Sequence, residues 1–308
     1  MKRIFLILFL IPSLAFAQQL GTVTDLHTPR TPCPTGFTCG NYIVSTPYTP
    51  SIRGYAAILE PTGPVNATNL YFAGASGTGF WQGWAATSPL VQSFWDVQAN
   101  AGQRIIQWVW LQLWSTAIFN GLPVYSRIAS CRAATVIDFF QRRYGGDFNV
   151  LGSSWGSGEV AFAIANWPIT VHRAFIISGP MAMNIAEGCE TTDFRNPYYY
   201  SPGVAGGVDL FMGLTSRPCY NRDASYDQIW RQNSVEFGGV YVYPNTGIRI
   251  YVGQNDERDI TSRGGFYNDL LRQAGQTDLQ FSVVPSCGHE FQSSPTGLAA
   301  LEQGLLTP

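Results

Sequence analysis

Apolar runs that alternate with helical segments place the strongest limit on how this chain can fold. After residue 53, runs rich in Ile, Val and aromatic residues, such as 104–110 and 248–252, are separated by helical patterns such as 127–144. Strands and helices in this order form a mostly parallel sheet with helices on both faces. We therefore predict an α/β domain over residues 53–308. Within it we expect strands at 55–59, 69–73, 104–110, 148–151, 174–178, 248–252 and 279–284, and helices at 89–99, 127–144, 158–166, 261–274 and 297–304.

Two segments depart from this alternation. Residues 18–52 are rich in Thr and Pro, and we expect them to form an extended N-terminal arm. Residues from about 181 to 246 contain few periodic elements and many aromatic side chains. Because irregular segments of this length are carried on the surface of a regular scaffold, we interpret it as a cap inserted over one end of the sheet.

Residues 1–17 have the features of a secretory signal peptide. Lys2 and Arg3 precede a short apolar run, and residues 15–17, Ala-Phe-Ala, offer small residues at a cleavage site. The alternative is a membrane anchor, but this run is short for a membrane span. We expect cleavage after Ala17 and a secreted or periplasmic mature protein with no membrane span.

The six cysteines predict a disulfide-bonded protein, because an exported chain meets an oxidising compartment. Six cysteines allow 15 connectivities. Cys33 and Cys39 flank a turn-rich loop and are expected to pair locally, and Cys189 pairs with Cys219 in the irregular segment. Cys131 and Cys287 remain as the third pair. The chain contains neither CxxC nor HExxH, so we predict no metal site and no cofactor.

The charge pattern argues against nucleic acid as a partner. The net charge is −2, only 12% of residues are charged, and acids and bases are scattered along the chain. Proteins that bind nucleic acid or anionic membranes concentrate basic residues on one surface.

The stretch LGSSWGSG, residues 151–158, lies between a predicted strand and a predicted helix. It contains G-x-S-x-G, in which a serine on a strained turn points outward and its neighbours two positions before and after must lack bulk. Only Ser154 has Gly152 and Gly156 at these positions. Ser153 and Ser157 do not, so Ser154 is the predicted nucleophile.

A serine hydroxyl needs a base, and the chain has three histidines. His27 lies in the N-terminal arm, and His172 precedes a strand and so lies at the wrong end of a parallel sheet. His289 follows the last strand and lies at the same end as Ser154. It is the predicted base by elimination.

The acid that orients His289 is predicted to be Asp256, just beyond the strand at 248–252. Glu257 and Asp259 are neighbours that compete for this role. The order Ser154, Asp256, His289 is the order found in α/β-hydrolases.

Two backbone N–H groups are expected to stabilise an oxyanion. One belongs to Trp155, which follows the nucleophile. The other comes from the loop AGASGTG after an earlier strand, with Ala75 as the first candidate and Ser76 as the next. The same loop could suggest a nucleotide site, but it lacks the third glycine, having Gln82 there, and no GK[ST] follows.

The chain from about residue 53 onward resembles the α/β-hydrolase superfamily. The stretch SSWGSGEVAFAIANWPITVHRAFIISGP is similar to the elbow, helix and next strand of prolyl-aminopeptidase-like hydrolases. The stretch from Gly253 to Phe291 is similar to the acid–helix–strand–histidine segment of dipeptidyl-peptidase-like enzymes and secreted esterases. The oxyanion loop AGASGTG differs from the His-Gly-Gly-Pro-Gly of the aminopeptidases. The resemblance implies the α/β-hydrolase fold and hydrolysis by a serine nucleophile.

Three functions fit these residues. The first is a secreted serine esterase acting on a small or polymeric ester. The second is a serine peptidase, which would use acids such as Glu187, Glu190 and Asp193 to bind a substrate amine. The third is an inactive, hydrolase-like binding protein. Aromatic residues near the predicted site favour neutral esters with a short or aromatic acyl group, including aromatic polyesters, and the predicted substrate-binding residues are Phe80, Trp81 and Trp84.

Overall fold

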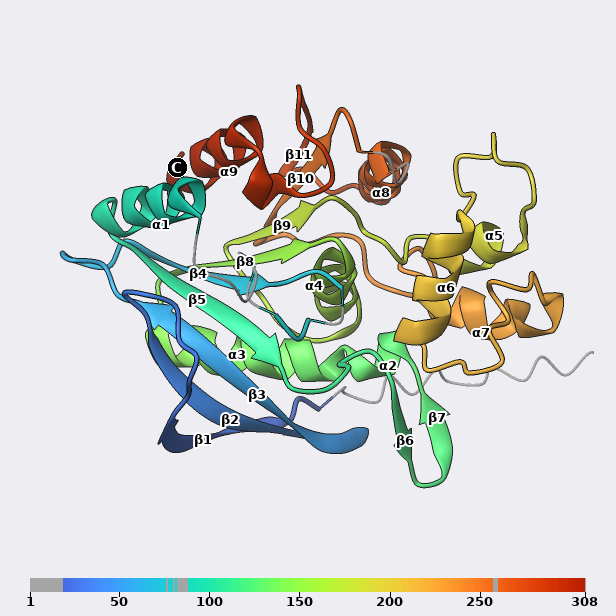
Figure 1. Cartoon of the computed structure of the whole chain (residues 1–308), viewed down its shortest axis with the longest axis horizontal. Helices are drawn as coiled ribbons and strands as arrows, with labels where there is room; N and C mark the ends of the chain where they lie inside the picture. Colours follow the sequence, from blue (N-terminus) through green and yellow to red (C-terminus); the bar gives the residue numbers. More distant parts are fainter. Residues whose placement is uncertain (1–18, 76, 80, 82–87, 257–259, 308) are drawn as a thin grey trace, which may run out of the picture.

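A nine-stranded, mostly parallel sheet forms the centre of the protein in a computed structural model (Figure 1). The structure describes residues 19–75, 77–79, 81, 88–256 and 260–307. The strand order is β1-β2-β3-β5-β4-β8-β9-β10-β11. Pairing is antiparallel from β1 to β5 and parallel from β5 to β11. The predicted α/β class with a mostly parallel sheet is therefore confirmed.

The strands of the sheet are β1 (Thr22–Pro29), β2 (Thr38–Thr46), β3 (Thr49–Leu59), β4 (Ala67–Phe72), β5 (Gln103–Trp110), β8 (Asp147–Ser153), β9 (Arg173–Ile177), β10 (Gly247–Gly253) and β11 (Leu279–Val284), and β6 (Ala117–Phe119) and β7 (Leu122–Val124) form a separate hairpin. The helices are α1 (Pro89–Asn100), α2 (Ser126–Ala129), α3 (Cys131–Tyr144), α4 (Trp155–Asn166), α5 (Ile185–Glu190), α6 (Pro202–Phe211), α7 (Asp227–Gln232), α8 (Ile260–Ala274) and α9 (Pro295–Leu306). The single helix predicted at 127–144 is divided at Ser130 into α2 and α3.

Two hydrophobic cores lie on opposite faces of the sheet. Side chains alternate along each strand, so Ile250 of β10 belongs to the core under α3, α4 and α8, whereas the adjacent Tyr251 belongs to the core under α1 and α9. Both faces of the parallel strands are covered, which is why these strands appear as nearly continuous apolar runs in the sequence.

The segment expected to be an extended arm continues the sheet. Its strands β1 and β2 pair antiparallel with each other, and β2 pairs with β3. The predicted signal peptide, residues 1–17, lies outside the described residues. Among the helices that the structure does describe, none is long and apolar enough to cross a membrane.

The irregular segment from 181 to 246 contains α5, α6, η1 (Ala224–Tyr226) and α7. Figure 1 shows these short helices grouped beside the carboxyl ends of the parallel strands. We refer to residues 181–246 as the cap.

Two of the three predicted disulfides are present. Cys33 is bonded to Cys39, and Cys189 to Cys219. The prediction of a Cys131–Cys287 bond is wrong, because both of these cysteines are free and buried. Cys131 lies in the core under α3 and Cys287 in the core under α9, so the sheet separates them.

Titration of thiols tests this arrangement. In the folded protein, Cys131 and Cys287 are fully buried and burial raises the pKa of each thiol, to about 11 for Cys131, so both should react slowly. After unfolding without reductant, a thiol reagent should find two thiols per chain, and after reduction six. Absence of free thiol in the unfolded, unreduced protein would contradict the structure.

Candidate active site

Ser154 stands on a sharp turn between β8 and α4. Its backbone has φ 55° and ψ −123°, a region that residues with a side chain rarely adopt. The turn is tight on both sides: a methyl group at Gly152 would lie 2.1 Å from the carbonyl oxygen of Gly156, and one at Gly156 would lie 2.6 Å from that of Ala73. The two glycines therefore allow β8, α4 and the end of β4 to meet at Ser154.

Ser154, His289 and Asp256 form a continuous hydrogen-bonded array. The Ser154 Oγ lies 2.8 Å from Nε2 of His289. The other ring nitrogen, Nδ1, lies 2.9 Å and 3.2 Å from the two carboxylate oxygens of Asp256. The Asp256 side chain is fully buried and that of His289 is 9% exposed, so the array is largely shielded from water.

The loops after β10 and β11 bring the acid and the histidine together. A methyl group at Gly253 would lie 2.3 Å from the carbonyl oxygen of Gly288, and the N–H of Asn255 donates to the carbonyl of Cys287 at 2.8 Å. The hydroxyl of Ser178, which follows β9, donates to the carbonyl of His289 at 2.8 Å. The sequence alone gives no sign of Ser178, because its hydrogen bond joins the loop after β9 to the loop after β11.

The loop after β4 approaches the nucleophile closely. A methyl group at Gly74 would lie 2.8 Å from the Cβ of Ser154. The N–H of Gly77 donates to the carbonyl of Gly74 at 3.0 Å, which closes a turn around Ala75, whose φ is 51°. We refer to the described residues Gly74, Ala75 and Gly77 as the oxyanion turn, after the predicted donor Ala75, and Gly74 lies against Ser154.

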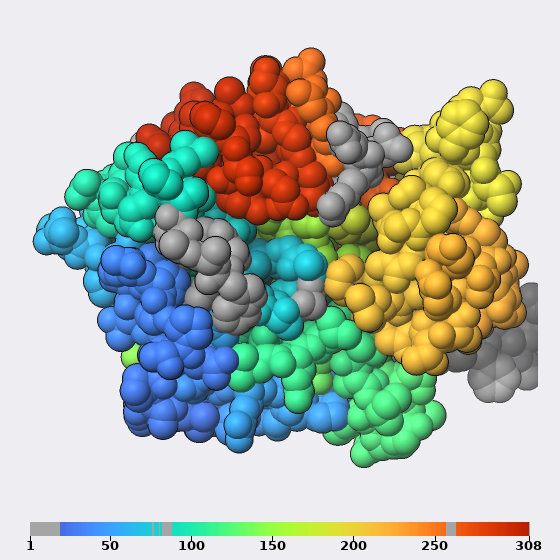
Figure 2. Space-filling model, in the orientation of Figure 1, coloured from blue at the N-terminus to red at the C-terminus, as the bar shows by residue number. Residues whose placement is uncertain are grey.

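A cavity of about 480 Å³ opens above Ser154. Its walls come from the oxyanion turn, the turn at Ser154 and α6 of the cap. In Figure 2 the yellow and orange cap lies beside a cyan part of the chain. Of the described residues that line the cavity, Glu290 alone is charged. The described lining residues are Ala73, Gly74, Ala75, Thr78, Gly79, Trp81, Ser153, Ser154, Trp155, Met181, Gly203, Val204, Gly207, Val208, Phe211, Glu290 and Gln292.

The aromatic wall of the cavity includes Trp81, one of the three predicted substrate-binding residues. Phe80 and Trp84 lie outside the described residues. Trp81 lines the cavity but is 4% exposed and packs against Trp95 in the core under α1. The sequence did not single out Phe211, which stacks on Trp155 with ring centroids 4.5 Å apart.

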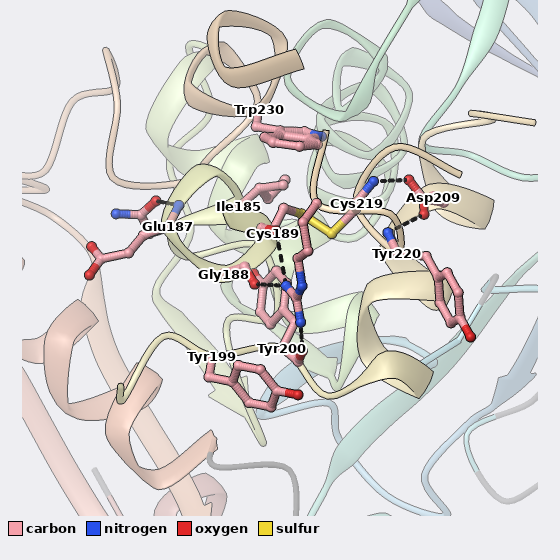
Figure 3. The surroundings of a disulfide bond; sticks show 12 residues. Ile185, Glu187, Gly188, Cys189, Tyr199, Tyr200, Asp209, Cys219, Tyr220 and Trp230 are labelled. Carbon is pink, nitrogen blue, oxygen red and sulfur yellow. Dashed lines mark hydrogen bonds between the residues drawn. A yellow bond between two sulfur atoms is a disulfide. The ribbon is translucent and has the colours of Figure 1, made fainter. Parts of the chain in front are cut away.

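A disulfide and buried polar contacts hold the cap together (Figure 3). The Cys189–Cys219 bond joins α5 to the segment after α6. The buried carboxylate of Asp209, on α6, accepts the N–H groups of Cys219 and Tyr220 at 2.9 and 2.8 Å. Arg222 donates to the carbonyls of Gly188, Cys189 and Tyr200. These contacts fix the position of α6 and therefore of one wall of the cavity.

The acids considered for binding a substrate amine are absent from the described lining of the cavity. Glu187 accepts a hydrogen bond from Asn196, and exposed Asp193 pairs with Arg195. Glu190 lies at the end of α5. Within the described part of the chain, no group of three or more His, Cys, Asp or Glu side chains could hold a metal ion.

No family model and no curated sequence matches this chain. Among solved structures, a carboxyl esterase from Bacillus coagulans is similar, with a TM-score of 0.55 and 11% identity. The match covers 92% of this chain and 97% of the esterase chain. Est1E from Butyrivibrio proteoclasticus, with ferulic acid bound, has a TM-score of 0.53 and 12% identity, covering 83% and 95%. An acylaminoacyl peptidase from Pyrococcus horikoshii has a TM-score of 0.56 and 11% identity. The match covers 88% of this chain but only 41% of the peptidase chain.

The protein has the α/β-hydrolase fold. In this fold the nucleophile, acid and histidine follow different strands of one sheet. Here Ser154, Asp256 and His289 follow β8, β10 and β11.

A buried acid, Glu159, is an additional feature of this protein. It lies on α4, is fully buried, and its Oε1 accepts a hydrogen bond from the indole N–H of Trp110 at 2.7 Å. Burial raises the pKa of this carboxyl well above its usual range, only partly opposed by the bond from Trp110. The sequence shows Glu159 as one acid in an apolar helix and gives no sign of its partner.

Glu159→Gln should change how stability depends on pH. Because the pKa of Glu159 is raised in the folded state, folding takes up a proton at a pH between the unfolded pKa, about 4.5, and the folded pKa. The stability that Glu159 provides therefore declines as pH rises through this range. In that window the free energy of unfolding of Glu159→Gln, relative to the unmodified protein, should rise by about 1.4 kcal/mol per pH unit. Urea unfolding from pH 5 to 8 measures this difference, and parallel pH profiles for the two proteins would contradict a neutral Glu159.

Proposed function

We propose that the protein is a secreted serine hydrolase that cleaves carboxylic esters through an acyl-enzyme. The observation that carries the proposal is the hydrogen-bonded array of Ser154, His289 and Asp256 at the base of the cavity. The predicted signal peptide and the two disulfides support secretion.

The geometry supports a two-step reaction. Ser154 Oγ attacks the ester carbonyl while His289 Nε2 takes its proton, and Asp256 stabilises the imidazolium. The N–H groups of Ala75 and Trp155 are the proposed donors to the oxyanion. His289 then gives its proton to the departing alcohol. In the second step it takes a proton from water, whose oxygen attacks the acyl carbonyl. The bond between the acyl carbon and Ser154 Oγ then breaks, His289 returns the proton to Oγ, and the acid leaves.

The lining of the cavity favours neutral esters with a short or aromatic acyl group. Trp155 and Phe211 offer stacked rings beside the nucleophile, and aromatic contacts of this kind contribute about 0.5–1.5 kcal/mol each beyond area burial. Glu290 would repel an anionic substrate. The similar Est1E structure contains ferulic acid, an aromatic acid. Aromatic polyesters also fit these requirements.

The two other functions receive less support. An aminopeptidase needs acids around the substrate amine, and the candidate acids Glu187, Glu190 and Asp193 are not among the described lining residues. An inactive binding protein has no need of a Ser–His–Asp array in which both hydrogen bonds have catalytic geometry.

Labelling and substitution test the triad. A fluorophosphonate should modify Ser154 alone, because its Oγ is the one bonded to His289. Ser154→Ala and His289→Ala should lower kcat on p-nitrophenyl butyrate by about 10⁴-fold or more, and Asp256→Asn by about 10⁴-fold. Asp259→Asn serves as the matched control, with activity retained. An adduct on Ser153 or Ser157, or full activity in Ser154→Ala, would refute the assignment.

Phe211→Ala tests the aromatic cavity. The ratio of kcat/KM for phenyl esters to that for aliphatic esters of equal length should fall about 3- to 10-fold, the loss expected for one aromatic contact. Leu210→Ala is the matched control, since Leu210 is the preceding residue of α6 and is 61% exposed. If the ratio is unchanged in Phe211→Ala, or falls equally in Leu210→Ala, the aromatic preference has another origin.

A further inference from the structure

We propose that Glu159 is a positioning residue that holds the oxyanion turn in place through Trp110. The inference rests on the proposed ester hydrolysis and adds a residue to its machinery. It is built from three consecutive contacts, all among described residues.

The first contact joins α4 to the end of β5. Glu159 and Trp110 are both fully buried, and the indole N–H of Trp110 donates to Glu159 Oε1 at 2.7 Å. The acceptor stabilises this indole N–H, since an unpaired buried donor costs about 1–3 kcal/mol. Glu159 therefore fixes both the rotamer of Trp110 and its orientation relative to α4.

The second contact joins Trp110 to the oxyanion turn. The backbone N–H of Trp110 donates to the carbonyl of Gly77 at 2.8 Å. The Trp110 ring also packs against Gly77: a methyl group on the Cα of Gly77 would lie 2.8 Å from Cδ1 of Trp110. Gly77 has φ 70°, so it also has the backbone conformation that glycine adopts readily. The turn thus rests on the ring that Glu159 orients.

The third contact lies within the turn. Gly77 N–H donates to the carbonyl of Gly74, and Ala75, the proposed oxyanion donor, lies between them. A shift of the Trp110 ring would move Gly77 and, through this hydrogen bond, the peptide groups around Ala75. Displacement of a donor by a fraction of an ångström is enough to weaken its bond to the oxyanion.

The second proposed donor belongs to the same unit. Trp155, whose N–H faces the oxyanion in the proposed mechanism, lies four residues before Glu159 on α4, so their side chains occupy one face of the helix. The ring centroids of Trp155 and Trp114 lie 6.4 Å apart. Trp114 also packs against Gly77, since a methyl group on Gly77 would lie 3.4 Å from Cδ1 of Trp114. Glu159 and Trp155 thereby connect the helix of the nucleophile to the turn on the opposite side of the cavity.

Substitutions at both ends of the first contact test the proposal. Glu159→Leu removes the acceptor, and Trp110→Phe removes the indole donor while keeping the backbone N–H. Each should lower kcat on p-nitrophenyl butyrate about 10- to 100-fold with little change in KM, because the oxyanion forms only after binding. The double variant should be no worse than the more impaired single variant. Glu159→Gln keeps an acceptor of the same shape and should stay within about twofold of the unmodified protein.

A thionoester distinguishes positioning of the oxyanion turn from general loss of stability. It places sulfur, a weak hydrogen-bond acceptor, where the oxyanion forms, so its hydrolysis depends less on those donors. The ratio of oxoester to thionoester turnover should therefore fall about 5-fold or more in Glu159→Leu and in Trp110→Phe. Val136→Ala, a buried substitution on α3, is the control for lost stability and should keep the ratio unchanged.

The outcomes separate this inference from the proposed function. An active protein whose ratio is unchanged in Glu159→Leu and Trp110→Phe overturns the positioning role alone, as does an equal loss in Glu159→Gln. A protein inert towards esters, with Ser154 unlabelled, overturns the proposed function and this inference together. If Glu159→Leu does not fold, Trp110→Phe carries the same test.

Discussion

The close approach of three backbones at Ser154 is the constraint on which the rest of the site depends. Gly152 and Gly156 have no side chains, and this lets β8 turn into α4 against the end of β4. The turn holds Ser154 in a left-handed conformation that costs about 1–3 kcal/mol at a residue with a side chain. The surrounding sheet and helix stabilise it, and the strain directs the serine hydroxyl towards the cavity.

The parallel sheet then brings the remaining groups to the same edge. Because β4, β8, β9, β10 and β11 run in one direction, the loops after their carboxyl ends meet there. Each loop contributes one part: the oxyanion turn, Ser154, Ser178, Asp256 and His289. Ser178 illustrates how the arrangement is braced, since its hydroxyl connects the loop after β9 to the carbonyl of His289.

The cap gives the cavity its size and chemistry. The Cys189–Cys219 bond, Asp209 and Arg222 supply contacts that hold α6. Phe211 at the end of α6 then stacks on Trp155, beside the nucleophile. The proposed substrate preference therefore depends on a segment with weak sequence periodicity, whereas the proposed chemistry depends on the sheet.

The sequence by itself determined the α/β class, the strand–turn–helix around Ser154 and the two disulfides, because each follows from local spacing, from hydrophobic periodicity or from position in one irregular segment. Position relative to strand ends was enough to select His289 and Asp256, which the structure places in hydrogen-bond contact. Tertiary structure decided what depends on distant residues. The sheet separates Cys131 from Cys287, and only the packing of α4 against β5 pairs Glu159 with Trp110. No spacing along the chain encodes these relations, because they arise from which face of the sheet each side chain occupies.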